Sequence, residues 1–398
     1  MFLAASLVTL ISLSHAETLH AVVTVQRHGD RTVKSKPPTK LTPLGQLQCH
    51  DAGSFYRQRY LIVGPKRIDG ISTSSFDAKQ VYAMAPDQPL LVTSGQAFLQ
   101  GLYPPVKPVG RPVKLANGQT VNDPVNGLQY TTLHSISVSD TDTIWLKADD
   151  NCPNFEIQSN EYLGSPEYVR LSGETDKFYQ SLKRDYLNGV FKERDIGYQN
   201  AYNIFDYINV GSLHNETISS KLSRGELSRL RVLADRHEWA MNANVSEEHP
   251  ALTISGRGLG QKIANQLETN LMSLGKENKF TLMMSSYDAF MAFFSHVGLT
   301  SVSPDFMGLP NYAASMVFEL YSTSKSNAKY PPPDELNVRF LFRNGTDSNV
   351  PLQEFPIFGK DNLPWLSFQE KNCRILNQKH VRVVCDVWCG CEFLSGKY

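Results

Sequence analysis

The amino-acid sequence predicts an α/β fold: a three-layer, mostly parallel sheet with helices on both faces, plus an inserted, mainly helical domain. Two observations lead to this prediction. Apolar runs rich in β-branched residues are repeatedly followed by a loop and a helix start, which is typical of a parallel sheet buried on both sides. From residue 107 to residue 250 the pattern changes to turns rich in Gly, Pro, Asn and Asp, separated by long helical segments.

The first strand is predicted at residues 21–25, with the sequence Ala-Val-Val-Thr-Val. A helix follows it, with Thr42 as its N-cap and Pro43 at its first helical position. The same order returns in a short strand at 81–84 and a helix at 91–102. The beginning of the chain therefore alternates strand and helix.

Two late strands, at 318–321 and 338–342, alternate between apolar and polar residues, and the second precedes the turn Asn344-Gly345. They predict that the sheet finishes with antiparallel pairing. The other expected elements are helices at 223–242, 258–274 and 288–294 and a strand at 280–284. We assign residues 17–106 and 251–398 to one α/β domain and residues 107–250 to the mainly helical insert.

Composition limits the class of protein. A chain of 398 residues corresponds to roughly two to three domains or to one enlarged α/β domain. Because 39 basic residues balance 39 acidic ones, the chain lacks the basic footprint of a nucleic-acid-binding protein. Hydrophobic residues make up 41% of the chain, which supports a large buried core and argues against disorder.

The first 16 residues have the features of a signal peptide. The apolar run at 2–13 is too short to cross the roughly 30 Å of a bilayer core, and it ends in the small-x-small pattern Ser14-His15-Ala16. The alternative is a buried first helix, because the segment contains no Lys or Arg. No later apolar run is long enough to span a membrane, so we expect a secreted protein of the extracellular space, cell wall or vacuole, with no membrane partner.

Six cysteines and three sequons fit the secretory route. The cysteines could form three disulfides in any of 15 pairings. We interpret the tail sequence C-D-V-W-C-G-C as disulfide-stapled in preference to zinc-binding, because no second matched pair and no histidine at ligand spacing follows it. The cysteines are Cys49, Cys152, Cys373, Cys385, Cys389 and Cys391, and the sequons begin at Asn215, Asn244 and Asn344.

The motif that carries chemistry is Arg27-His28-Gly29-Asp30-Arg31, directly after the first strand. Open α/β sheets bind ligands beyond the carboxyl ends of their strands. Two arginines bracketing a histidine can grip phosphoryl oxygens while a neutral imidazole attacks phosphorus, and the flanking cations favour the neutral imidazole. Gly29 lets the backbone approach closely. A histidine or arginine alone at this position would more often be structural, but the whole motif favours phosphate chemistry.

At this motif the sequence resembles the histidine acid phosphatases of fungal type, the secreted branch of a superfamily that also contains phytases. Their signature is R-H-G-x-R-x-P. The resemblance continues through residues 41–45, 97–105 and 286–289. It implies that the α/β domain is catalytic, that His28 becomes a phosphohistidine, and that Asp288 protonates the leaving oxygen. It also implies that Arg27 and Arg31 clamp the phosphate.

Asp288 has a second argument in its favour. It follows the strand predicted at 280–284 at a helix start, so its carboxyl should face the same sheet edge as His28. The alternative is that it only caps the helix. As a general acid it would link an acidic pH optimum to its protonated fraction. The remaining histidines lack metal-ligand spacing, so we expect no metal and no cofactor.

Three departures from the family pattern bear on activity. Val33 replaces the usual proline, Met84 and Leu90 stand where arginines are expected, and Tyr287 stands in place of a histidine. Because the stretch 81–100 contains no Lys or Arg, any replacement cation must come from elsewhere. The candidates are Lys34, Lys36, Arg57 and Arg67.

The leading hypothesis is therefore a metal-free acid phosphatase that hydrolyses small phosphate monoesters. Its rival is a secreted, phosphatase-like glycoprotein that binds phosphoesters without turning them over, because of the changes at Met84, Leu90 and Tyr287. Phytase specificity would need a wide cationic pocket, which the zero net charge does not support. A phosphomutase of the same superfamily fits poorly with the leader, sequons and cysteines.

Overall fold

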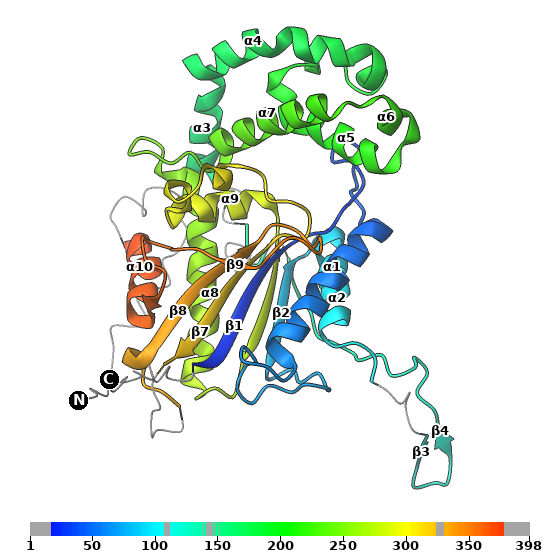
Figure 1. The fold of residues 1–398 in the computed structure, drawn as a ribbon, viewed down its shortest axis with the longest axis vertical. Helices are drawn as coiled ribbons and strands as arrows, with labels where there is room; N and C mark the ends of the chain where they lie inside the picture. Colours follow the sequence, from blue (N-terminus) through cyan, green and yellow to red (C-terminus); the bar gives the residue numbers. More distant parts are fainter. Residues whose placement is uncertain are drawn as a thin grey trace, which may run out of the picture.

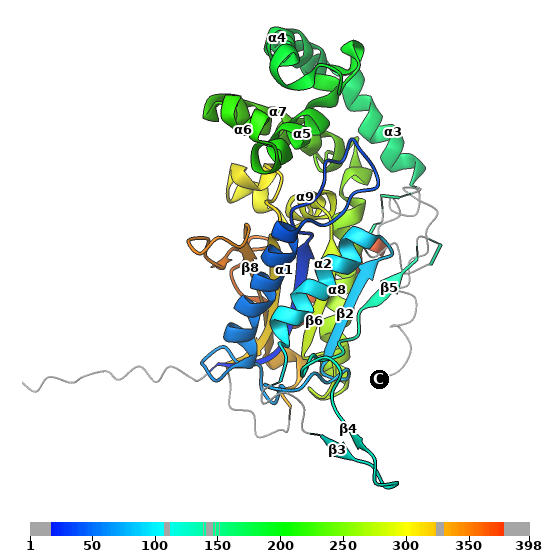
Figure 2. The same ribbon diagram turned by 90° about the vertical axis from the view of Figure 1, so that its right-hand side faces the viewer.

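A central sheet organises the molecule (Figure 1). The computed structural model describes residues 17–106, 112–137, 139–140, 146–147, 149–150, 152–323 and 330–377, the side chains of 373–377 excepted. Within these residues eight strands form one sheet in the order β10-β8-β7-β1-β6-β2-β5, with β9 paired to β8. Helices cover both of its faces (Figure 2), so the predicted fold class is confirmed.

The sheet has a parallel half and an antiparallel half. The parallel strands are β1 (Thr18–Arg27), β6 (Phe280–Ser285), β2 (Val81–Pro86) and β5 (His134–Ile136). The antiparallel strands are β7 (Ser315–Ser322), β8 (Leu336–Arg343), β9 (Gln353–Glu354) and β10 (Leu363–Pro364). The late antiparallel pairing is therefore confirmed, as are the predicted strands at 21–25, 81–84, 280–284, 318–321 and 338–342.

The helices pack on the two faces according to the alternation of side chains in β1. Val22 faces the core beneath α1 (Pro43–Tyr56) and α2 (Pro89–Leu102), whereas Val23 faces α8 (Ile254–Met272), α9 (Tyr287–His296) and α10 (Trp365–Asn377). Thr42 is the N-cap of α1, and its hydroxyl accepts a hydrogen bond from the Gly45 amide, as predicted. A π-helical turn, Arg57–Leu61, extends α1.

A group of helices lies over the carboxyl edge of the parallel strands (Figure 1). It has its own core, rich in Tyr, Leu and Ile. A capping box between Ser223 and Glu226 begins the longest of them. The helices are α3 (Pro153–Glu161), α4 (Pro166–Leu182), α5 (Ala201–His214), α6 (Glu216–Lys221) and α7 (Arg224–Asn242).

The segment assigned to the helical insert also contributes strands. Strand β5 pairs with β2 in the main sheet. A small hairpin of β3 (Val113–Lys114) and β4 (Thr120–Val121) projects away from the helices (Figure 2). The division at residues 107 and 250 therefore stays a proposal, with α3 to α7 as the helical part.

The expectation of three disulfides is wrong. Cys49 is free and fully buried in α1, where the Ser94 side chain and the Gly29 backbone are its hydrogen-bond partners. Cys152 is disulfide-bonded to a cysteine outside the described side chains. Cys373, Cys385, Cys389 and Cys391 have side chains outside those described, as do all residues of the proposed signal peptide, 1–16.

A buried ion cluster ties the beginning of β1 to the antiparallel half of the sheet. The carboxylate of Glu319, which is fully buried, accepts hydrogen bonds from Arg339 at 2.6 Å, Tyr60 at 2.7 Å and Arg59 at 3.0 Å. Arg339 also donates to Glu17 at 2.6 Å. Burial removes water from these charged groups, and the ion pairs and hydrogen bonds to their partners compensate for this loss.

We expect Arg339→Met to destabilise the fold by about 3 kcal/mol, because it leaves the Glu319 carboxylate buried beside a single remaining arginine. Urea unfolding followed by circular dichroism measures the change. The matched control is Arg170→Met, which breaks an exposed pair with Glu174 and should cost about 0.5 kcal/mol or less. Equal stabilities for the two variants would contradict this account.

The same cluster makes the stability of the fold depend on pH in acid solution. Burial raises the pKa of Glu17, but hydrogen bonds from Arg339 and Lys66 outweigh it and lower that pKa to about 2. A carboxyl with a depressed folded pKa contributes stability above its unfolded pKa and loses it as the pH falls through its folded pKa. This part of the stability should thus be lost below about pH 4, and Arg339→Met should reduce the loss.

Candidate active site

Two neighbouring strands bring the sequence-predicted residues together. Strands β1 and β6 are parallel, and Arg27 is in register with Ser285. The chain therefore leaves both strands at the same edge, carrying His28 from one and Asp288 from the other. Both side chains line one cavity of about 380 Å³.

His28 is buried and held in one tautomer. The residue is 4% exposed, and Nδ1 of its ring lies 2.9 Å from the carbonyl oxygen of Gly29. A carbonyl can only accept a hydrogen bond, so Nδ1 carries the proton and the lone pair lies on Nε2. Burial, followed by the charges of Arg27 and Arg31, holds the pKa of His28 well below its usual value. Both effects favour the neutral ring, and a neutral imidazole with its lone pair on Nε2 is able to act as a nucleophile.

Arg31 is fixed beside this ring by the helical group. Its guanidinium forms an ion pair with Asp206 of α5 at 3.0 Å and donates to the hydroxyl of Tyr202 at 3.2 Å. Arg31 lines the same cavity as His28. Its charge is thus positioned before any ligand arrives, although Asp206 partly neutralises it.

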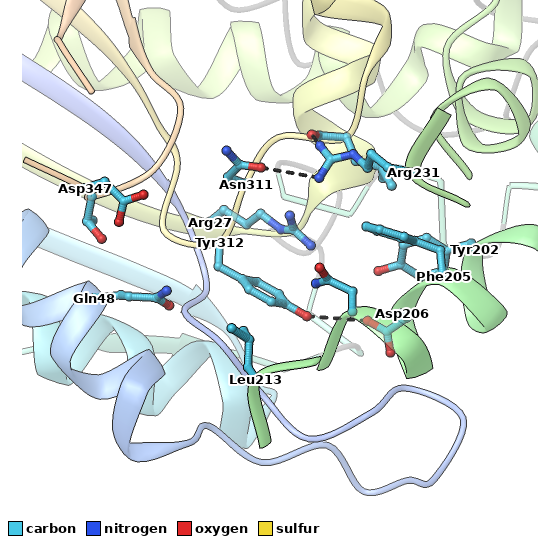
Figure 3. A pocket seen from close by; sticks show the side chains of 13 residues that line it. Arg27, Gln48, Tyr202, Phe205, Asp206, Leu213, Arg231, Asn311, Tyr312 and Asp347 are labelled. Atoms are coloured by element: carbon cyan, nitrogen blue, oxygen red, sulfur yellow. Dashed lines mark hydrogen bonds between the residues drawn. The ribbon is translucent and has the colours of Figure 1, made fainter. Parts of the chain in front are cut away.

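Arg27 is directed into a second, neighbouring cavity of about 220 Å³ (Figure 3). Its guanidinium lies 4.8 Å from the centre of the Tyr312 ring and donates to the carbonyl of Pro310. Arg231 lines the same cavity and is held by Asp235 at 2.8 Å. The two arginines of the motif therefore line different cavities, and Arg31 shares its cavity with His28.

Asp288 lies in the first turn of α9 and faces a lysine. The N-cap of this helix is Ser286, so the alternative that Asp288 caps the helix is wrong. Its Oδ2 lies 3.5 Å from Nζ of Lys147, and its buried Oδ1 has no hydrogen-bond partner. Burial raises the pKa of Asp288, but Lys147, Ser286 and Lys34 outweigh it and lower that pKa. In the free protein these contacts therefore favour the ionised carboxylate, whereas a proton donor must be protonated.

A second carboxyl in the cavity behaves in the opposite way. Burial and the negative charge of Asp288 raise the pKa of Asp149, which also lines the cavity. The Ser255 hydroxyl donates to Asp149 at 2.6 Å. Of these two carboxyls, Asp149 is therefore the one whose pKa is raised. Neither Lys147 nor Asp149 lies in a motif, so sequence reasoning missed both.

The described residues show no metal centre and no membrane span. Among them, no three or more His, Cys, Asp and Glu side chains gather as ligands of one ion would. None of the helices in the described part of the chain combines the length and the apolar character needed to cross a bilayer.

Comparison with known proteins decides the family. Residues 37–343 match the histidine phosphatase superfamily (branch 2). The chain belongs to this superfamily. The match begins after the Arg27–Arg31 motif, so motif and match are separate observations. Human lysosomal acid phosphatase is 24% identical over 379 residues, which cover 87% of this chain and 80% of that protein. The lysosomal acid phosphatase of Xenopus laevis is 23% identical over 383 residues, with 88% and 79% covered.

Solved structures show the same fold. A Klebsiella phytase superposes with a TM-score of 0.61 and 14% identity, covering 90% of this chain and 95% of its own. The phytase of D. castellii superposes with a TM-score of 0.57 and 14% identity, covering 96% and 84%. At these identities the likeness concerns the fold alone.

The departures from the family pattern have different structural consequences. Leu90 lines the cavity together with Gln88, so this wall is neutral. Met84, in contrast, is fully buried in the hydrophobic core and does not line the cavity. The strand period explains the difference, because Met84 points into the sheet face and only the chain beyond β2 reaches the edge.

Tyr287 uses its hydroxyl within the protein. The phenol donates to Oε2 of Glu238 at 2.6 Å, and the other oxygen of that carboxylate lies 2.9 Å from Nδ1 of His237. The aromatic ring of Tyr287 still lines the cavity. The expected hydrogen bond from this phenol to a phosphate therefore has a competing acceptor.

Gly29 serves the packing of the motif against α1. A Cβ at this position would lie 2.3 Å from the carbonyl oxygen of Gly45, closer than any side chain tolerates. The close approach expected of Gly29 is thus an approach to another backbone segment.

Of the four candidate replacement cations, one reaches the cavity. Lys34 lines it, with Nζ 4.9 Å from the centre of the Tyr202 ring. Lys36 lies over the ring of Tyr207 instead. Arg57 and Arg67 donate to the backbone carbonyls of Leu102 and Ile71, away from the cavity.

Proposed function

We propose that this protein hydrolyses small phosphate monoesters through a phosphohistidine on His28. The observation that carries the proposal is the shared cavity, in which a neutral histidine with a free Nε2 and the carboxyl of Asp288 line the same space. Arg31 and Lys34 supply positive charge to the same cavity. A small phosphomonoester fits these groups without a metal or a cofactor.

The reaction has two displacements at phosphorus. In the first, the lone pair of His28 Nε2 forms a bond to phosphorus, the ester P–O bond breaks, and the leaving oxygen takes a proton from Asp288. In the second, water attacks phosphorus, the P–N bond breaks, and the Asp288 carboxylate takes the proton of that water. Alcohol and inorganic phosphate are the products, and the protein returns to its starting state.

Asp288 must hold a proton for the first step. In the free protein Lys147 lowers its pKa and so favours the ionised form. A bound phosphate dianion attracts the lysine and repels the carboxylate, and both effects raise the pKa of the carboxyl. Substrate binding thus favours protonation of the Asp288 carboxyl, which the first step requires. A low pH favours the same protonation.

The rival function, phosphoester binding without turnover, also has observations in its favour. Arg31 is partly neutralised by Asp206, the hydroxyl of Tyr287 is engaged by Glu238, and Leu90 leaves one wall neutral. Each of these weakens the stabilisation of transition-state charge.

The deciding experiment traps the covalent intermediate. The protein is mixed at acid pH with a monoester labelled on phosphorus and quenched in alkali, which preserves phosphohistidine. We expect label on the protein that acid treatment removes and that peptide mapping assigns to His28. Tight binding of the monoester with no label and no released phosphate would instead favour the rival function.

We further propose that the chain follows the secretory route to the extracellular space, the cell wall or the vacuole. The side chains of Asn215, Asn244 and Asn344 are all exposed, as glycan attachment requires. The relatives named above are lysosomal enzymes. Protein from a eukaryotic secretory host should begin near Glu17 and lose mass on treatment with an N-glycosidase, as mass spectrometry would show. Retention of residues 1–16 and an unchanged mass would refute this proposal.

A further inference from the structure

A lysine lines the cavity in which position 90, an arginine in the family pattern, is a leucine. Lys147 lines the same cavity as His28 and Asp288, and its side chain is only 15% exposed. Its Nζ lies 3.5 Å from Oδ2 of Asp288. The nearby wall formed by Gln88 and Leu90 at the start of α2 carries no charge.

The topology of the sheet explains how this lysine arrives there. Strand β5 is the parallel neighbour of β2, and the Asp87 amide donates to the carbonyl of Ile136 just beyond the paired residues. The chain therefore leaves β5 beside the start of α2, at the same edge as Leu90. Lys147, later in the chain, lines the same cavity as Leu90.

Contacts on both sides anchor this lysine. Leu146 is buried in the main core, and Asp149 accepts a hydrogen bond from Ser255 of α8. Cys152 is buried against Ala251. A charge held in this way is positioned in advance, which lowers the entropy lost when it binds a ligand.

We propose that Lys147 is the third cationic ligand of the phosphoryl group and that it moves from Asp288 to the phosphate when substrate binds. The proposal rests on the proposed function, because it takes this cavity as the phosphate site. A separation of 3.5 Å is long for a charge-assisted hydrogen bond, so the lysine is not fully committed to Asp288. Lys147 would thus couple phosphate binding to proton uptake by that carboxyl.

Other charged groups lie close to Lys147 and Asp288. Asp150 lies 3.9 Å from Lys147 Nζ, and Asp149 lowers the local potential further. Lys34 faces Asp288 from the motif loop and lines the cavity as well. Removal of Lys34 should therefore weaken anion binding, whereas only removal of Lys147 should abolish most of the coupling between binding and proton uptake.

The test uses inorganic sulfate, a tetrahedral dianion whose own charge stays constant in mildly acid buffer. Titration calorimetry in two buffers of different ionisation heat gives both the Kd and the protons taken up. For the unaltered protein we expect uptake of close to one proton. Lys147→Met should weaken binding about 10- to 100-fold and remove most of this uptake, and Lys147→Arg should restore both.

Two further variants separate this role from a structural one. Asp288→Asn should bind sulfate more tightly than the unaltered protein, because it frees Lys147 and removes a negative charge. The gain from Asp288→Asn should be clearly smaller when it is made in the Lys147→Met background, where only the second effect remains. Lys36→Met, which alters a lysine outside the cavity, is the matched control and should change nothing. Thermal unfolding verifies that each variant is folded.

The proposal is overturned if folded Lys147→Met binds sulfate within twofold of the unaltered protein, or if Asp288→Asn gives the same gain with and without Lys147. These measurements need no turnover. Absence of a phosphohistidine would therefore refute the proposed function without deciding the role of Lys147, and the reverse also holds.

Discussion

Replacing His28 by alanine is expected to abolish the phosphoenzyme and to lower the rate of monoester hydrolysis by about 10⁴-fold or more. The imidazole of His28 lines the cavity, and because its Nδ1 is held on the Gly29 carbonyl, the lone pair on Nε2 is left to attack phosphorus. Alanine leaves the arginines in place, and the variant should still bind phosphate. Quenched-flow labelling and steady-state rates measure the two effects.

The matched control is His50→Ala, which removes an exposed imidazole from α1. This variant should keep the rate and the label of the unaltered protein. External imidazole should partly restore hydrolysis to His28→Ala, because the cavity left by the side chain can admit a free nucleophile. Equal labelling of His28→Ala and the unaltered protein would mean that another residue carries the phosphorus.

The position of the motif was predictable because it depends on local signals. A β-branched run ending at the motif predicts a buried strand, and a second such run before Asp288 predicts another. Parallel strands end at one edge, so the meeting of His28 and Asp288 follows from two local patterns and one topological rule. The structure bears out each strand and their parallel pairing.

The charges around Asp288 were not predictable. Lys147 belongs to a connection between β5 and α3 that has no periodic pattern, and its path is set by tertiary anchors such as Ser255. The pKa of Asp288 depends on that path. Similarly, nothing in the sequence distinguishes Glu238 from other polar residues of its amphipathic helix. Only the fold brings its carboxylate to the Tyr287 hydroxyl. A polar residue on the buried side of that helix was the one available signal.

Alignment with the family pattern also placed one residue, Met84, wrongly in the pocket. Met84 aligns with an arginine of the family pattern, which suggested a place in the pocket. In the structure it is fully buried in the core, because it is still within β2 and its side chain follows the strand period. Leu90, six residues later, is beyond the strand and does reach the cavity. The loss of charge that matters is therefore the one at position 90.

Replacing Asp288 by asparagine should give an effect that depends on the leaving group. Asparagine matches the shape of the carboxyl but can neither deliver an acid proton nor remove one from water. With an alkyl phosphate, whose leaving oxygen needs a proton, we expect kcat to fall by about 10²- to 10⁴-fold. With an aryl phosphate carrying a weakly basic leaving group, phosphorylation of His28 should be nearly unaffected.

For the aryl ester the second step then becomes limiting, since water attacks the phosphohistidine without a base. The variant should release a burst of phenol and accumulate labelled protein, which rapid-quench measurements can follow. Asp149→Asn is the informative control, because Asp149 lines the same cavity and holds its proton more readily. If Asp149→Asn shows the larger dependence on the leaving group, Asp149 is the proton donor and Asp288 serves to hold Lys147. If Asp288→Asn slows alkyl and aryl esters equally, its carboxyl transfers no proton to the leaving oxygen.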